Sequence, residues 1–221
     1  GAGTMGHGIA QVLAMSGIET CLFDINEDAV ADGLAKVAGN LDKGVARGKV
    51  AAEDKAAAVA RLSGAVDLDL AIEGVQVVVE AVPERMDLKR DLFGRLGAAL
   101  GPDVLLATNT SSLSITEIAD ATEHPERVVG MHFFNPVHIM KLVEVVRTER
   151  SSEDAAQMAL ALARRMGKDP IDVRDAPGFA SSRLGIAIGM EAIRMVEEKV
   201  ASAEDIDKAM VLGYGFPMGP L

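Results

Sequence analysis

The chain opens on Gly1-Ala2-Gly3-Thr4-Met5-Gly6, a stretch that fits the pattern G-x-G-x-x-G. In this pattern the first glycine permits a tight turn, the second lets a pyrophosphate approach the backbone, and the third lets a helix pack closely on a sheet. Apolar residues then recur at helical spacing from 5 to 16, so a helix N-terminus would face the phosphates. The stretch predicts a dinucleotide-binding loop with contacts from Gly1, Gly3, Thr4, Met5 and Gly6.

A carboxylate follows this helix at the spacing that such a loop requires. Residues 20–24 read as a short strand, with Cys21 buried in it, and Asp24 ends the strand roughly 20 residues after the glycines. Asp24 would accept hydrogen bonds from the adenosine ribose and would repel the 2′-phosphate of NADP. The sequence therefore predicts NAD as the cofactor and Asp24 as a ligand of its ribose. The alternative is an ordinary glycine turn followed by a surface aspartate.

Composition excludes several classes of protein. The chain has 221 residues, 49% of them hydrophobic, which is enough for a substantial core, and its formal net charge of −11 disfavours nucleic acid and anionic lipid surfaces as partners. Its one cysteine excludes an internal disulfide, and no pattern of metal ligands is present. Charges interrupt every apolar stretch before it reaches membrane-spanning length. We expect a cytoplasmic protein without a metal or a membrane partner.

Helical and strand patterns alternate along most of the chain, which is typical of an α/β protein. The run at 75–82 is β-branched and almost wholly apolar, so it is expected to be a central parallel strand. The full set of expected elements is helices at 27–46, 51–61, 85–98, 115–120 and 152–166, and strands at 75–82, 104–107, 128–133, 142–147 and 171–173.

This order predicts a Rossmann-like dinucleotide-binding domain over residues 1–175, with a helical hairpin inserted at about 27–61. Its first strand would precede Gly1 and is missing from this sequence. Residues 176–221 read as the start of an all-helical C-terminal domain, with helices at about 179–199 and 203–212. We expect both ends to be truncations, and the piece alone to associate through the apolar positions Ile186, Met190 and Ile193.

A histidine and a glutamate are brought together if the strands at 128–133 and 142–147 form an antiparallel hairpin centred on residue 138. In that register His132 lies directly opposite Glu144. Directly opposed residues have Cβ atoms about 4.5 to 5.5 Å apart, so the carboxylate could hold one imidazole nitrogen while the other exchanges a proton. Such a pair is either structural or catalytic, and spacing alone does not decide between the two.

Taken together, these motifs resemble the L-3-hydroxyacyl-CoA dehydrogenase family, most closely its bacterial 3-hydroxybutyryl-CoA type. The resemblance runs along the whole chain. It is carried by G-A-G-T-M-G-H-G-I-A-Q at 1–11, V-E-A-V-P-E at 79–84, N-T-S-S-L at 109–113, H-F-F-N-P-V at 132–137, K-L-V-E at 141–144, P-G-F at 177–179 and G-Y-G-F-P-M-G-P at 213–220.

The resemblance implies reversible, NAD-dependent oxidation of an (S)-3-hydroxyacyl-CoA to the 3-oxoacyl-CoA. It makes His132 the base that removes the hydroxyl proton, Glu144 the residue that orients it, and Ser111 a hydrogen-bond partner of the substrate hydroxyl. Ser111 could also act as a helix cap. The positions that match contacts to the nicotinamide half of the cofactor are Glu84, Lys89, Asn135 and Ser111, whereas Glu80 reads as a strand-end charge.

The remaining candidates concern the acyl-CoA. Ser182 stands where many members of the family have asparagine, so a shorter hydroxyl replaces an amide that helps to hold the substrate. Residues 36–61 carry six basic and three acidic side chains. They are either a solvated helix pair or, as the resemblance implies, a surface for coenzyme A, with Asn40, Lys43 and Arg47 as candidate contacts.

Two other functions stay open at this point. One is a dehydrogenase of free hydroxy acids or sugar acids on the same scaffold. The other is a dinucleotide-binding relative that has lost catalysis. The resemblance further implies a homodimer formed through the helical C-terminal domain.

Overall fold

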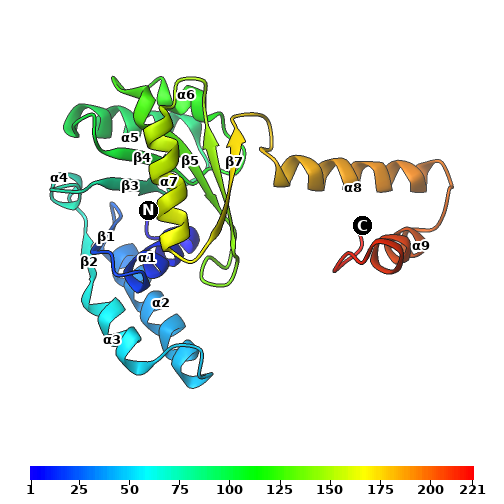
Figure 1. Cartoon of the computed structure of the whole chain (residues 1–221), viewed down its shortest axis with the longest axis horizontal. Helices are drawn as coiled ribbons and strands as arrows, with labels where there is room; N and C mark the ends of the chain where they lie inside the picture. Colours follow the sequence, from blue (N-terminus) through cyan, green and yellow to red (C-terminus); the bar gives the residue numbers. More distant parts are fainter. The chain divides into compact units, whose positions relative to one another are not determined.

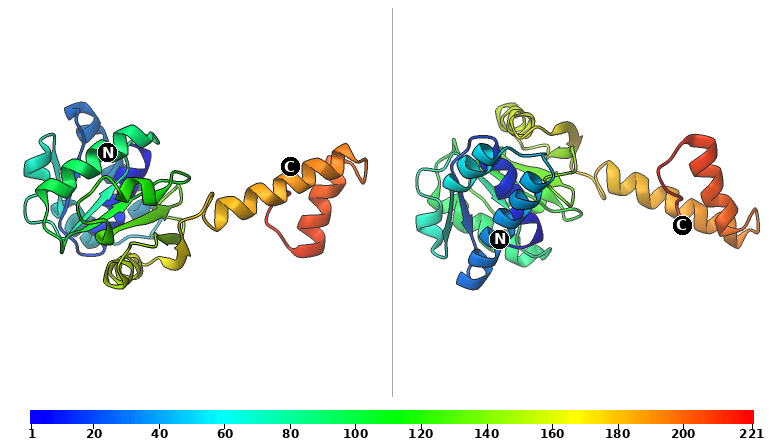
Figure 2. Two further views of the ribbon diagram at one scale, coloured as in Figure 1. Left: turned by 90° about the horizontal axis from the view of Figure 1, so that it is seen from above. Right: turned by 90° about the horizontal axis from the view of Figure 1, so that it is seen from below.

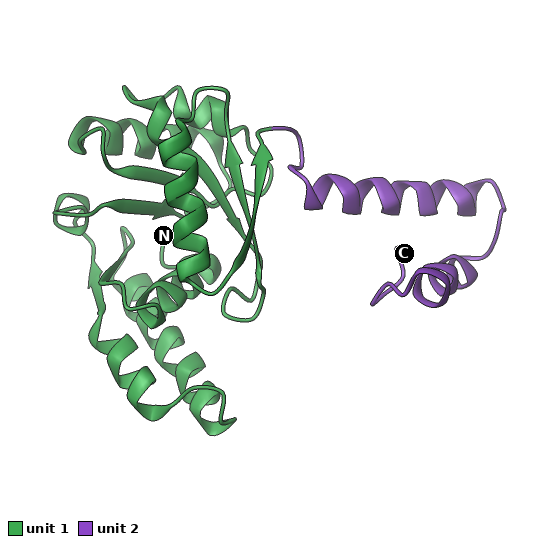
Figure 3. Ribbon diagram, viewed as in Figure 1, with its two compact units in different colours: residues 1–175 green, residues 176–221 purple.

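The computed structural model describes all 221 residues, which form two compact units, Gly1–Asp175 and Ala176–Leu221 (Figure 3). The first unit alternates helices and strands, so the expectation of an α/β fold is confirmed (Figure 1). Its elements are α1 (Thr4–Met15), β1 (Thr20–Phe23), α2 (Glu27–Ala46), α3 (Ala52–Ala60), β2 (Leu62–Ala65), α4 (Leu68–Ala71), β3 (Val77–Glu80), α5 (Met86–Ala99), β4 (Leu105–Thr108), α6 (Ile115–Ala119), η1 (Pro125–Arg127), β5 (Val128–Phe133), β6 (Leu142–Arg147), α7 (Glu153–Arg165) and β7 (Asp169–Arg174).

The strands of this unit form two sheets. Five strands pair in the order β3-β4-β5-β6-β7, and β1 pairs with β2 in a separate parallel ribbon. β3, β4 and β5 run parallel, β6 is antiparallel to β5, and β7 is parallel to β6. β2 and α4 were not expected from the sequence, because each has only four residues and neither is a continuous apolar run.

Two sequence predictions about the sheet are wrong. β3 is an edge strand of the five-stranded sheet, not a central one, and its first three residues are only half-buried. Cys21 is exposed, because the pleat of β1 turns Leu22 toward the core and Cys21 to the opposite face. A cavity of about 690 Å³ is lined by residues of both β1 and β3, which accounts for the exposure of these strands.

Helices cover both faces of the five-stranded sheet, with α5 and α7 on opposite sides (Figure 2). Small residues of α7, such as Ala159 and Ala163, pack with Ile9 and Val12 of α1 against apolar side chains of β4, β5 and β6. On β5, a Cβ at Gly130 would overlap Cδ1 of Ile115 on α6, so glycine lets the side chain of Ile115 pack closely on the strand. This packing fixes the carboxyl ends of β3, β4 and β5 at one edge of the sheet.

The second unit contains α8 (Ser181–Glu197), α9 (Ala203–Lys208) and the π-helical turn η2 (Ala209–Gly213). The helix expected at 203–212 is thus α-helical only over its first half. Ser202 caps α9 by accepting a hydrogen bond from the backbone N–H of Asp205, as the sequence pattern predicts. No helix of either unit has both the length and the apolar character needed to cross a membrane.

Candidate active site

The glycine loop is shaped by backbone contacts at two positions and is open at the third. A Cβ on Gly1 would lie 2.6 Å from the carbonyl oxygen of Ala81, just after β3, and a Cβ on Gly6 would overlap the carbonyl of Gly1. No atom lies within 4 Å of the place where a Cβ on Gly3 would be. No side chain caps α1, so its first N–H groups have no side-chain acceptor. The loop therefore fits a pyrophosphate bound at a helix N-terminus.

Asp24 lies beside this loop. Its Oδ2 accepts a hydrogen bond of 2.8 Å from the backbone N–H of Ala2, so the carboxylate at the end of β1 is tied to the start of the chain's first turn. A carboxylate fixed at this place suits the ribose hydroxyls of an adenosine. The glycine loop, the helix that follows it, Asp24 and the parallel strands fit a bound dinucleotide.

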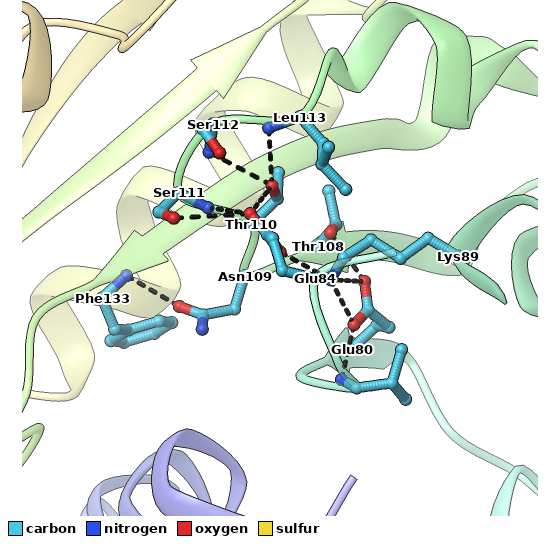
Figure 4. Close-up of polar contacts among 11 residues, drawn as sticks. Glu80, Glu84, Lys89, Thr108, Asn109, Thr110, Ser111, Ser112, Leu113 and Phe133 are labelled. Atoms are coloured by element: carbon cyan, nitrogen blue, oxygen red, sulfur yellow. Dashed lines mark hydrogen bonds and ion pairs between the residues drawn. The ribbon is translucent and has the colours of Figure 1, made fainter. Parts of the chain in front are cut away.

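A second part of the site is the turn that follows β4. Thr110 organises it, because its hydroxyl oxygen accepts hydrogen bonds from the N–H groups of Ser112 at 3.3 Å and Leu113 at 2.9 Å (Figure 4). The turn exposes Ser111. Just before it, Oδ1 of Asn109 accepts a hydrogen bond of 2.9 Å from the N–H of Phe133 at the end of β5. The turn is therefore attached to the strand that carries His132.

His132 and Glu144 face each other across β5 and β6. The register pairs them directly, as predicted, and Nδ1 of His132 lies 2.7 Å from Oε2 of Glu144. Glu144 is fully buried and His132 is 7% exposed, and the imidazole packs against the ring of Phe134 with 4.5 Å between the ring centroids. The carboxylate thus fixes the orientation of the imidazole.

A buried network lies at the end of β3, and it corrects the interpretation of Glu80 as a simple strand-end charge. Glu80 is 3% exposed, and its carboxylate pairs at 2.7 Å with the fully buried ammonium of Lys89. Lys89 also lies 3.4 Å from Oε2 of Glu84. The sequence contained a signal for the burial of Glu80, because this glutamate directly follows three apolar residues of the same strand. A solvated surface role for Lys89 is excluded by its burial.

Glu84 connects this network to the serine turn. Its Oε1 accepts hydrogen bonds from the hydroxyl of Thr110, the N–H of Ser111 at 2.9 Å and the hydroxyl of Ser111 at 3.4 Å (Figure 4). Burial by itself would raise the pKa of Glu84, but the hydrogen bonds from Thr110 and Ser111 and the charge of Lys89 together lower it below its usual value. Glu84 is therefore ionised near neutral pH.

The other candidate residues are more dispersed. Asn40 is half-buried, and its amide donates a hydrogen bond of 3.2 Å to Gln11, so it braces α2 against α1. Lys43 and Arg47 are exposed near the end of α2. Asn135 is exposed after β5, whereas Ser182 belongs to the second unit and is half-buried in α8.

The fold and the site define a class, that of dinucleotide-binding domains with a buried histidine–carboxylate pair. Comparison with known proteins identifies the family. Residues 1–176 match the family described as "3-hydroxyacyl-CoA dehydrogenase, NAD binding domain", and residues 178–221 match "3-hydroxyacyl-CoA dehydrogenase, C-terminal domain". The chain belongs to the 3-hydroxyacyl-CoA dehydrogenase family of NAD-dependent oxidoreductases.

Individual relatives agree with this assignment. The chain is 42% identical over 221 residues to the 3-hydroxybutyryl-CoA dehydrogenase of Clostridioides difficile. The match covers all of this chain and 78% of that protein. It is 41% identical over 226 residues to the human mitochondrial hydroxyacyl-coenzyme A dehydrogenase, covering 72% of that protein. The crystal structure of (S)-3-hydroxybutyryl-CoA dehydrogenase from Ralstonia eutropha matches with a TM-score of 0.95 and 42% identity, over all of this chain and 78% of that one.

Proposed function

We propose that this protein catalyses the reversible NAD-dependent oxidation of (S)-3-hydroxyacyl-CoA, such as 3-hydroxybutyryl-CoA, to 3-oxoacyl-CoA. The observation that carries the proposal is the 2.7 Å contact between Nδ1 of His132 and Oε2 of Glu144. Membership of the 3-hydroxyacyl-CoA dehydrogenase family supports it. The names of the relatives support a short-chain acyl-CoA as the substrate.

In this proposal the imidazole of His132 accepts the proton of the 3-hydroxyl group through Nε2, since Nδ1 faces Glu144. Bound NAD would accept the hydride from C3. Glu144 stabilises the imidazolium that forms, because its buried carboxylate lies against the opposite nitrogen. In the reverse direction the protonated His132 returns the proton to the 3-oxo oxygen.

Ser111 is proposed to hydrogen-bond the oxygen on C3 of the substrate. Its hydroxyl is exposed, and the turn that presents it is fixed by Thr110 and Glu84. For the cofactor, the proposed contacts are those predicted from the sequence. They are Gly1, Gly3, Thr4, Met5 and Gly6 at the pyrophosphate, Asp24 at the ribose, and Glu84 and Asn135 at the nicotinamide half, where the fully buried Lys89 is proposed to act through its contact with Glu84.

The helical hairpin formed by α2 and α3 is proposed to bind the coenzyme A part of the substrate. Lys43 and Arg47 are exposed there and can pair with phosphates. Asn40 supports this surface, because its hydrogen bond to Gln11 joins α2 to α1. Ser182 is proposed to contact the substrate through its hydroxyl, in place of the amide common in the family.

We also propose that residues 1–175 form the NAD-binding domain and that the helical unit 176–221 contributes to a homodimer. In this unit α8 exposes a series of apolar side chains, with 63% of Leu184, 65% of Ile186, 52% of Met190 and 46% of Ile193 accessible. A second copy of the chain would cover such a face. Light scattering after gel filtration would give twice the chain mass.

The experiment that tests the proposed reaction compares acetoacetyl-CoA with free acetoacetate in the presence of NADH. Oxidation of NADH with acetoacetyl-CoA, and none with acetoacetate at the same concentration, is the expected result. Equal rates with both would favour a dehydrogenase of free acids. No oxidation with either, while NADH still binds, would favour the non-catalytic relative.

A further inference from the structure

Glu80 is a buried carboxylate with donors at both of its oxygens, and the proposed reaction does not use it. Its side chain is fully buried, so it cannot touch substrate or cofactor directly. Each carboxylate oxygen receives two donors (Figure 4). Oε1 accepts from Lys89 at 2.7 Å and from the N–H of Val82 at 2.6 Å, and Oε2 accepts from Lys89 at 3.0 Å and from the hydroxyl of Thr108 at 2.6 Å.

Two chains of contacts lead from Glu80 to the proposed catalytic groups. One runs through Lys89 to Oε2 of Glu84, whose Oε1 holds the N–H and hydroxyl of Ser111. The other runs through the backbone, because the carbonyl of Glu80 accepts a hydrogen bond of 2.8 Å from the N–H of Asn109. The Asn109 side chain in turn holds the backbone of Phe133, next to His132.

The charges make the first chain dependent on Glu80. Lys89 is a fully buried cation between two carboxylates, of which Glu80 is fully buried and Glu84 is 37% exposed. A buried ammonium that loses one partner is strongly destabilised, so it moves toward the remaining carboxylate or toward water. Either movement alters the contact between Lys89 and Glu84, and Glu84 holds the N–H of Ser111.

We propose that Glu80 is a positioning residue for the dehydrogenase reaction, which fixes Lys89 and Glu84 and thereby the turn that presents Ser111. The inference rests on the proposed function, since it assigns Ser111 to the substrate. It makes Glu80→Gln a disruptive change despite the similar shape of the side chain. An amide NH₂ group in place of Oε1 would meet two donors, Lys89 and the N–H of Val82, and in place of Oε2 it would meet Lys89 and force the Thr108 hydroxyl to turn from donor to acceptor.

A double-mutant cycle with Ser111→Ala tests the proposal. We expect Glu80→Gln to lower kcat for acetoacetyl-CoA reduction at least about tenfold alone, but less than about twofold in the Ser111→Ala background, since residues that act as a unit are not additive. Full additivity of the two changes overturns the proposal. Thr108→Val removes one donor to Glu80 while keeping both charges, and it enters the same cycle if Glu80→Gln does not fold. The matched control is Glu123→Gln, at an exposed carboxylate.

Hydrogen exchange gives a readout that does not depend on activity. Glu80→Gln should accelerate amide exchange in a peptide covering 109–114, with little change in a peptide covering the core strand 142–147. Unchanged exchange in the 109–114 peptide, or equal acceleration in both, would show that Glu80 does not position this turn. His132→Gln, measured in parallel, separates the two claims. If His132→Gln is inactive but the effects of Glu80→Gln and Ser111→Ala are additive, the proposed function is retained and only this inference is rejected.

Discussion

Nδ1 of His132 and Oε2 of Glu144 lie 2.7 Å apart across an antiparallel strand pair, at a position where the glutamate is fully buried. A buried carboxylate without a cationic or donor partner is costly. The strand register places the carboxylate of Glu144 against Nδ1 of His132, so the orientation of the imidazole depends on Glu144.

Glu144→Gln tests this dependence. We expect kcat for acetoacetyl-CoA reduction to fall by about 10²- to 10⁴-fold, because the amide keeps the shape but cannot stabilise an imidazolium. Steady-state kinetics measure the change. Glu153→Gln is the control, since it removes an exposed carboxylate that pairs with Arg147 at 2.7 Å and should change kcat by less than about twofold. Equal effects of the two substitutions would argue against a role for the buried pair.

Two glycines of the loop should respond differently to alanine. At Gly3 a Cβ meets no atom within 4 Å, so Gly3→Ala should fold normally and bind NADH more weakly, because the methyl group occupies the place of the pyrophosphate. At Gly6 a Cβ overlaps the carbonyl of Gly1, so Gly6→Ala should lower the thermal unfolding midpoint. NADH fluorescence titration and thermal unfolding check the pair. Unchanged NADH affinity in Gly3→Ala would place the pyrophosphate elsewhere.

Substitutions at Asp24 should change the choice of cofactor. Asp24→Asn keeps an acceptor for the N–H of Ala2 but removes the charge, so it should reduce the preference for NAD over NADP by about tenfold or more. Asp24→Ala should additionally weaken NAD, because it removes the ribose acceptor as well. Ratios of kcat/KM for NADH and NADPH measure both effects, and a preference that is unaltered in both variants would contradict the assignment.

His138 predicts a pH dependence of stability. Burial, the charge of Lys168 and the charge of His7 lower the pKa of His138 in the folded protein below 6.5. Between that lowered pKa and 6.5 the unfolded chain binds more protons than the folded protein. The free energy of unfolding therefore rises as the pH rises through this window and decreases as the pH falls through it. His138→Gln should flatten the dependence. Urea unfolding at several pH values between about 5 and 7 measures it, and an equal slope in both proteins would contradict the prediction.

Much of the site was accessible from local sequence features. The glycine loop and Asp24 follow a fixed spacing, and the pairing of His132 with Glu144 follows from a hairpin whose two strands are close in sequence. Strand register in such a hairpin is set by the short connection, which is why it could be predicted.

Contacts between distant segments could not be predicted in this way. Glu80 meets Thr108 only because β3 and β4 pair in parallel, a contact across 28 residues. The position of β3 at a sheet edge and the exposure of Cys21 depend equally on which strands pair, and an apolar run carries no information about that. The four-residue strand β2 lacks the length to stand out as a pattern.

The most direct test of the account is the kcat of His132→Gln with acetoacetyl-CoA and NADH, measured beside its NADH dissociation constant. The account predicts a fall in kcat of about 10²- to 10⁴-fold with the dissociation constant changed by less than about threefold, because the imidazole transfers the proton and does not hold the cofactor. A variant that binds NADH normally and retains a kcat near that of the unmodified protein would contradict it.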